Sequence, residues 1–160
     1  MSSHSDLREP VPTILVHGLW MSGFQLAVLK RRLAASGRLR PRAFSYTSLV
    51  GSMSDHVRRL IDFARAQKAA RLHFVGHSLG GLVILRALQL TDDLPPGRVV
   101  LLGSPLQGSK AAQGIARSVP LGKAILGAAL MEECIDCEPR TWSGRREVGV
   151  VAGSLSVGLG

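Results

Sequence analysis

Short apolar runs that alternate with amphipathic segments constrain the fold of this chain more than any other feature. The runs are rich in β-branched residues and end at glycine or a turn, which is typical of buried parallel strands. We expect strands at residues 13–17, 42–46, 72–75, 98–102 and 147–152, with helices at 22–36, from Ser54 to about 65, and at 79–90. Strands that alternate with helices imply right-handed crossovers. The pattern therefore predicts an α/β fold with a doubly wound, mostly parallel sheet of about five strands.

Length and composition indicate a single domain over residues 1–160. The chain is 46% apolar and 19% charged, and a chain of 160 residues can bury roughly 70% of its unfolded surface, which excludes intrinsic disorder. Residues 106–142 interrupt the alternation with prolines and glycines but stay rich in Ala, Leu and Ile, so we expect a helical lid there. No apolar run reaches the roughly 20 residues of a membrane-spanning helix, and the first ten residues are polar. A cytoplasmic protein is expected.

The net charge of +9 and the two cysteines narrow the classes of partner. Most of the excess bases fall on expected helix faces and loop ends, without the interleaved aromatic residues that nucleic-acid binding uses. We therefore expect no nucleic-acid partner, while a weak attraction to anionic membrane surfaces stays open. Cys134 and Cys137 end a helical pattern, and no histidine follows His77. This arrangement suits neither structural zinc nor redox chemistry, so no metal and no cofactor are expected.

The sequence Gly76-His77-Ser78-Leu79-Gly80 lies between an expected strand and an expected helix. In this context the GxSxG pattern predicts a nucleophile elbow, a tight turn that lifts the serine hydroxyl above the sheet where only glycines leave room for it. The helix that begins at Leu79 would direct its N–H groups and its positive dipole end toward charge developing beside Ser78. The alternative is a glycine-rich turn in which Ser78 only caps the helix.

A second loop follows the first expected strand at His17-Gly18-Leu19. An oxyanion hole requires a backbone N–H from such a loop in addition to one from the residue after the nucleophile. We therefore expect the N–H groups of Leu19 and Leu79 to form it. His17 is interpreted as a structural histidine that hydrogen-bonds the loop, with a role as catalytic base as the alternative.

At these residues the sequence resembles the α/β-hydrolase family, and within it the bacterial lipase and esterase branch, which is similar to PGAP1-type lipases. Three segments carry the resemblance: Leu15-Val-His-Gly18, Phe74-Val-Gly-His-Ser-Leu-Gly-Gly81 and Leu102-Gly-Ser-Pro-Leu-Gln-Gly-Ser109. The resemblance implies a serine carboxylic ester hydrolase that acts through an acyl-enzyme on a small-molecule or lipid ester. It assigns Ser78 as nucleophile, Leu19 and Leu79 as the oxyanion hole, and Gly76, His77, Gly80, His17 and Gly18 as supports of the elbow and the loop.

The family's triad follows the order serine, acid, histidine, but this chain has no histidine after His77 and no later acid at the expected strand end. We expect the 160 residues to be the front part of a longer hydrolase and, by themselves, nearly inactive, because a serine without a base is a poor nucleophile. The open strand that ends near Ala152 is also expected to promote self-association through residues 148–159. The alternatives are a thioesterase or acyltransferase, and a non-catalytic protein of the same fold that binds a ligand or partner.

Overall fold

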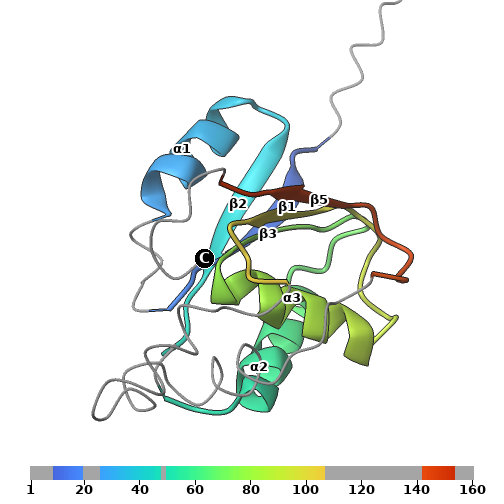
Figure 1. Cartoon of the computed structure of the whole chain (residues 1–160). Helices are drawn as coiled ribbons and strands as arrows, with labels where there is room; N and C mark the ends of the chain where they lie inside the picture. The colour runs from blue at the N-terminus through green and yellow to red at the C-terminus, as the bar shows by residue number, and fades with distance from the viewer. Residues whose placement is uncertain (1–8, 20–25, 48–49, 107–141, 154–160) are drawn as a thin grey trace, which may run out of the picture.

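The computed structural model of the chain describes residues 9–19, 26–47, 50–106 and 142–153. These residues form a five-stranded parallel sheet with the strand order β2-β1-β3-β4-β5. In chain order the elements are β1 (Val11–Val16), α1 (Ala27–Ala35), β2 (Leu39–Phe44), α2 (Met53–Arg65), β3 (His73–His77), α3 (Leu79–Leu90), β4 (Val99–Leu102) and β5 (Val148–Val151). Figure 1 shows α1 on one face of the sheet and α2 with α3 on the other. The predicted α/β class and doubly wound parallel sheet are confirmed.

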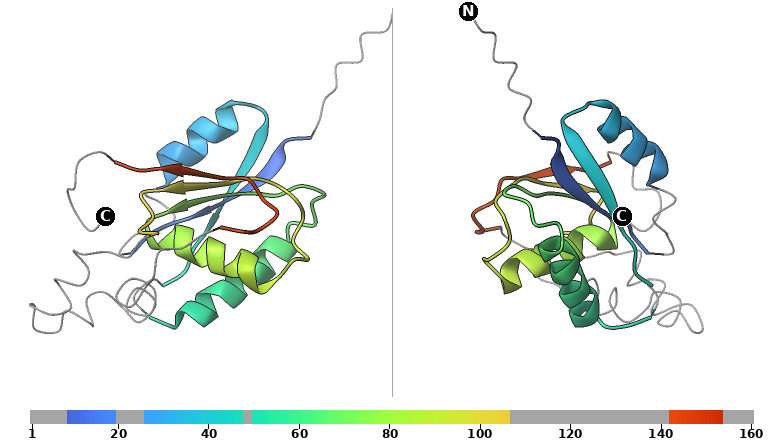
Figure 2. Two further views of the ribbon diagram at one scale, coloured as in Figure 1. Left: turned by 45° about the vertical axis from the view of Figure 1, so that its right-hand side comes forward. Right: turned by 180° about the vertical axis from the view of Figure 1, so that it is seen from behind.

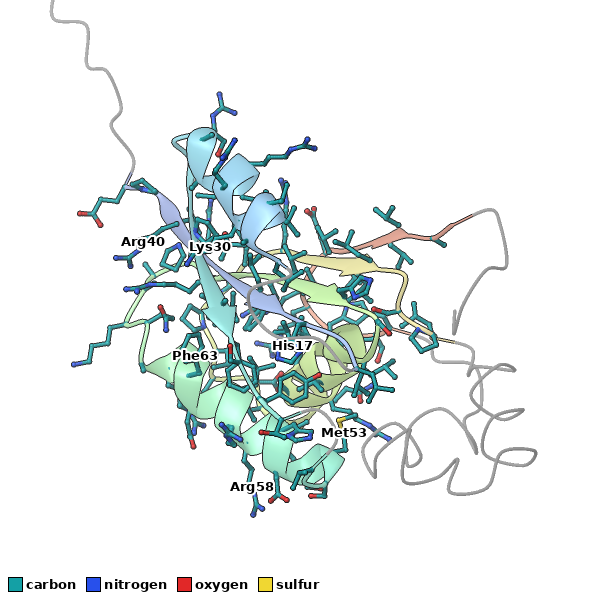
Figure 3. The ribbon with its side chains drawn as sticks, turned by 90° about the vertical axis from the view of Figure 1, so that its left-hand side faces the viewer. His17, Lys30, Arg40, Met53, Arg58 and Phe63 are labelled. Carbon is teal, nitrogen blue, oxygen red and sulfur yellow. The ribbon has the colours of Figure 1, made fainter. Side chains whose placement is uncertain are left out.

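The core lies between the sheet and the pair α2 and α3. α3 is apolar on nearly all sides, as the central helix of an α/β layer should be, and residues from Leu79 to Leu85 are all buried. α2 is amphipathic: Leu60 and Ile61 face the core, whereas Arg58 points away from it (Figure 3). A capping box starts α2, in which Ser52 and Asp55 satisfy each other's backbone N–H groups. No helix within the described ranges is long and apolar enough to cross a membrane.

β2 begins three residues earlier than the sequence predicted. The expected strand was 42–46, but the observed register pairs Val11 with Leu39 and Val16 with Phe44. The apolar pattern missed Arg40 and Pro41, because a proline and exposed charges are unusual in a buried strand. An edge strand tolerates both, since one of its sides makes no ladder hydrogen bonds.

β5 is the opposite edge of the sheet, and unlike β2 it consists of valine and glycine without charged residues. Among the described residues it pairs only with β4 (Figure 2), and by their accessible surface Val150 and Val151 are 51% and 58% exposed. The self-association expected through residues 148–159 stays a prediction. The expected lid over residues 106–142 lies outside the described residues except at its two ends.

Candidate active site

Ser78 directly follows β3 and precedes α3, in a backbone conformation that few side chains adopt. Its φ is 51° and its ψ is −123°, and the only other described non-glycine residue with a positive φ is Lys68. Such a conformation costs on the order of 1–3 kcal/mol and persists only where the surroundings impose it. Here the N–H of Ser78 donates to the carbonyl of Leu102 at 2.9 Å, and its own carbonyl accepts from the N–H of Gly81 at 3.0 Å. The chain therefore changes from strand to helix within one residue.

The hydroxyl of Ser78 is not used as a helix cap. Ser78 occupies the N-cap position of α3 but makes no side-chain cap hydrogen bond. Ser52, at the same position of α2, has an extended backbone, with φ −80° and ψ 164°, and its side chain accepts a hydrogen bond from the N–H of Asp55. The capping role considered for Ser78 is therefore absent, and this partly exposed residue keeps its hydroxyl out of the helix cap.

Glycines allow the main chain to approach itself closely around Ser78. A Cβ atom on Gly80 would lie 2.3 Å from the carbonyl oxygen of Val16, and one on Gly76 would lie 2.6 Å from the Cα of Gly81. A Cβ on Gly81 would lie 2.0 Å from the Oγ of Ser104, which follows β4. The first turn of α3 thus packs against the ends of β1, β3 and β4 with no space for side chains, as the elbow geometry requires.

The loop after β1 lies directly against the elbow. A Cβ on Gly18 would be 2.9 Å from the Cβ of Ser78 and 3.1 Å from the Nδ1 of His77. The next residue, Leu19, is buried, as is Leu79 on the other side of Ser78. The first N–H groups of a helix have no intrahelical acceptor, and that of Leu79 is one of them. The structure thus brings the predicted loop and elbow together, and the use of the two N–H groups as an oxyanion hole stays a prediction.

His17 is enclosed in the interior of the molecule, and both of its ring nitrogens have partners (Figure 3). Its Nδ1 lies 2.9 Å from the carbonyl oxygen of Gly18, and its Nε2 lies 3.4 Å from the backbone nitrogen of Tyr46. These partners assign the neutral tautomer with the proton on Nδ1. The ring of His17 also stacks on that of Tyr46 with centroids 4.5 Å apart. This imidazole fixes the loop and has no free nitrogen to offer Ser78.

Tyr46 is the site residue that the sequence analysis missed. Its hydroxyl donates to the carbonyl of His17 at 2.9 Å, and burial raises its pKa above the ordinary value. The contact joins residues 29 positions apart, so no local pattern reveals it. One feature of the sequence could have indicated a role for Tyr46, since the only tyrosine of the chain ends an expected strand.

The other described histidines and acids do not complete a triad with Ser78. His77 adjoins it in sequence, burial lowers the pKa of its imidazole, and its buried Nδ1 has no hydrogen-bond partner among the described residues. His73 lies at the far end of β3, and the ring of His56 packs on Tyr46 with centroids 4.6 Å apart. The described carboxylates that form ion pairs do so with arginines elsewhere: Asp55, Asp62, Asp93 and Glu147.

Comparison with known proteins agrees with this arrangement. The family model described as the alpha/beta hydrolase family matches residues 13–156. The chain therefore belongs to the α/β-hydrolase family. A search of curated proteins finds no match.

Solved structures of hydrolases are similar to the described fold. Phospholipase PlaB from Legionella pneumophila is 20% identical with a TM-score of 0.60, and the match covers 78% of this chain and 31% of that one. A monoacylglycerol lipase from Paleococcus ferrophilus is 22% identical with a TM-score of 0.54, and the match covers 68% and 48% of the two chains. The pyrethroid hydrolase PytH is 26% identical with a TM-score of 0.52, with coverage of 62% and 42%. The match thus spans less than half the length of each of these proteins.

Proposed function

We propose that the protein is a serine-dependent carboxylic ester hydrolase of the lipase or esterase type, with Ser78 as its nucleophile. The observation that carries this proposal is the strained backbone of Ser78, held between β3 and α3 with its hydroxyl left out of the helix cap. Strain of this kind costs stability and recurs at functional sites. The names of the similar structures, a phospholipase, a monoacylglycerol lipase and a pyrethroid hydrolase, support a lipid or small-molecule ester as substrate.

In the proposed reaction the Oγ of Ser78 attacks the acyl carbon and gives its proton to a base. The N–H groups of Leu19 and Leu79 hold the negative oxygen of the tetrahedral intermediate. The alcohol leaves with the proton, and a water molecule then attacks the acyl-enzyme, releases the acid and restores Ser78. The buried pair of His17 and Tyr46 keeps the loop that carries Leu19 against the elbow.

The base is the component for which no described residue is suited. His17 has both ring nitrogens engaged, and no histidine follows His77 in the sequence. Loss of the histidine from a serine triad lowers turnover by about 10⁶-fold, and binding with the oxyanion hole leaves on the order of 10³–10⁴-fold over water. We therefore propose that these 160 residues by themselves hydrolyse esters only weakly.

External imidazole provides a direct test, because it can take the role of the base. The 160-residue chain would be incubated with p-nitrophenyl butyrate and increasing imidazole, and both the release of nitrophenol and the mass of the protein would be followed. We expect imidazole to accelerate release above its own background and to allow acylation of Ser78, with both effects lost in Ser78→Ala. Ser54→Ala is the matched control, since it removes an exposed serine hydroxyl from α2, outside the elbow, and should behave as the wild type.

The second candidate is a non-catalytic protein of the same fold that binds a ligand or a partner. The observation that favours it is the missing base among the described residues. It predicts that imidazole gives the same rate with wild-type protein as with Ser78→Ala, and that no acyl group is found on Ser78. That outcome would overturn the hydrolase proposal.

A further inference from the structure

Arginines precede each of the last three strands of the sheet. Arg71 lies two residues before β3, Arg98 lies immediately before β4, and Arg145 and Arg146 lie shortly before β5. Because these strands are parallel neighbours, their amino ends meet at one end of the sheet. Figures 1 and 2 show the segments that lead into β3, β4 and β5 together at this end, opposite the end at which α3 begins. The topology therefore concentrates positive charge far from Ser78.

A cavity of about 600 Å³ lies at this end of the sheet. All four arginines line it, together with His73 and Trp142. Two carboxylates, Asp92 and Glu147, also reach it, so the guanidinium groups outnumber the carboxylates. A concave site with an excess of guanidinium groups is suited to an anion rather than to a neutral or cationic ligand.

Arg146 gives this cavity a fixed positive charge. Its two terminal nitrogens donate to the carbonyls of Leu72, at 2.8 Å, and of Pro95. Its guanidinium carbon lies 5.2 Å from the centre of the Phe74 ring, a cation–π contact, and the indole N–H of Trp142 donates to its carbonyl at 2.8 Å. The half-buried side chain is therefore held in one place before any ligand arrives.

Further donors line the cavity. Arg71 and Arg145 are exposed and form no ion pair within the part of the chain that the structure describes. The Nδ1 of His73 accepts the backbone N–H of Arg98 at 2.9 Å, which assigns the proton of the neutral ring to Nε2 and leaves that N–H as a donor. Burial, and after it the nearby charges of Arg71, Arg98 and Arg146, lower the pKa of His73.

The carboxylates do not neutralise this field. Glu147 pairs with Arg98 at 2.7 Å, and both side chains are about three-quarters exposed, at 78% and 74%. An ion pair in such contact with water is weak and rearranges at low cost. Arg71, Arg145 and Arg146 remain in excess over Asp92.

We propose that the cavity binds a phosphate-bearing ligand, with Arg71 and Arg145 as exposed contacts and Arg146 as the fixed charge. The planar fork of a guanidinium group matches the oxygens of a phosphate, and charge-assisted hydrogen bonds of this kind are among the strongest that proteins form. The same chemistry is offered by a soluble phosphate ester and by a phospholipid head group. The site is separate from Ser78, so its failure would leave the proposed hydrolase function untouched.

The test compares two double variants with the same change in net charge. Arg71→Ser with Arg145→Ser removes two exposed guanidinium groups from the cavity, whereas Arg31→Ser with Arg32→Ser removes two exposed ones from α1. Calorimetric titration with pyrophosphate at fixed ionic strength should show binding to the wild type, a loss of about tenfold or more in the cavity variant, and a change within about twofold in the α1 variant. The ring signals of His73 in NMR spectra should shift with pyrophosphate only where binding occurs, and thermal unfolding would show that both variants fold.

Vesicles distinguish the two sources of phosphate. Phosphatidylglycerol vesicles, with phosphatidylcholine vesicles as control, would be cosedimented with the same proteins. Vesicle binding that only the cavity variant loses, without binding of pyrophosphate, would identify a lipid head group as the ligand. Binding of pyrophosphate without any preference for anionic vesicles would identify a soluble ligand. Equal losses in the two double variants, or no binding of either probe, would overturn the proposal.

Discussion

β3 begins with His73 and ends with His77, and the surroundings of these two imidazoles differ. At His77 the main chain is packed against itself, with Gly18 and the elbow so close that no further Cβ fits. At His73 the neighbours are arginine side chains around a cavity. The pKa of both imidazoles is lowered, that of His77 by burial alone and that of His73 by burial followed by the charges of three arginines.

The comparison shows that the two ends of one sheet differ in charge more than in the closeness of their packing. The end at Ser78 depends on backbone contacts, so it should respond strongly to the addition of single carbon atoms. The end at His73 also contains a close approach, because a Cβ on Gly97 would lie 1.9 Å from the carbonyl oxygen of Leu72, but its long charged side chains should make it respond to salt.

The largest effect is expected for Gly80→Ala. The added Cβ would lie 2.3 Å from the carbonyl oxygen of Val16 and 2.5 Å from that of His17, and neither backbone atom can move without displacing β1. We expect a loss of about 3 kcal/mol or more in the free energy of unfolding, measured with denaturant. In Gly149→Ala the nearest atom to the new Cβ is 3.9 Å away, and the change should stay within about 0.5 kcal/mol. Similar stabilities for the two variants would contradict the close packing described at the elbow.

The second effect concerns the polar contacts that hold the loop after β1. His17→Phe keeps a buried ring but leaves the carbonyl of Gly18 and the N–H of Tyr46 without their partners. We expect unfolding to become easier by about 2 kcal/mol, and by about 1 kcal/mol in Tyr46→Phe, which removes one hydrogen bond. Because the two side chains contact each other, the double variant should lose less unfolding free energy than the sum of the losses in the two single variants. Strictly additive losses would contradict a shared network.

At the other end of the sheet, Arg146→Met should cost about 1 kcal/mol in the free energy of unfolding. The methionine keeps most of the side-chain volume but loses the hydrogen bonds to the carbonyls of Leu72 and Pro95 and the contact with Phe74. Arg98→Met is the control, since its ion pair with Glu147 is exposed and should contribute less than about 0.5 kcal/mol. An equal loss in both variants would show that Arg146 does not fix this end of the sheet.

The smallest effect is a difference in how the pKa values of the two histidines respond to salt. NMR titrations at about 0.05 M and about 0.5 M salt should show the pKa of His73 rising toward its ordinary value, because salt screens Arg71, Arg98 and Arg146. The pKa of His77 should stay constant, because burial alone lowers it. A shift of equal size at both histidines would remove the distinction between the two ends of β3.

The same pKa values set the direction of the pH dependence of stability. Well above pH 6.5, the ordinary pKa of histidine, both imidazoles are neutral in the folded and the unfolded chain and add nothing to the pH dependence of stability. As the pH falls below that value, the unfolded chain takes up protons that the folded chain resists, so the folded state loses stability until the pH passes the lowered pKa values. Between pH 7 and pH 5, the free energy of unfolding, measured with denaturant, should therefore fall less in His73→Gln than in the wild type.

Much of the fold could be predicted from the sequence because local patterns and tertiary packing agree. The helix over Leu79–Leu90 was predicted at its observed bounds, since a turn with glycines precedes it and its apolar residues are continuous. The bounds of β2 were wrong because Leu39 and Arg40 become a strand only by pairing with β1. That pairing joins residues far apart in the chain, and no local signal reports it.

In the candidate site, as in the fold, the parts that depend on local patterns could be predicted and the contacts between distant residues could not. The GxSxG context located Ser78, and the glycine after His17 located the second loop, because both patterns are local. Tyr46 was not found, since its contact with His17 depends on how β2 lies beside β1. The cluster of arginines was also missed, because the expected strand 98–102 includes Arg98, and only the observed bounds put an arginine before each of the three parallel strands. The lipase branch, the cytoplasmic location and the lid stay predictions.

The hydrogen bond from the N–H of Ser78 to the carbonyl of Leu102 has a consequence for dynamics. It continues the ladder between β3 and β4 one residue beyond the end of β3, so this amide should exchange with deuterium only when the two central strands separate. The side chain of the same residue is attached through a single rotatable bond and can turn within nanoseconds. Ser78 therefore combines an amide hydrogen that should exchange slowly with a hydroxyl group that can rotate quickly. Any change in the position of the hydroxyl during a reaction would come from rotation about the Cα–Cβ bond.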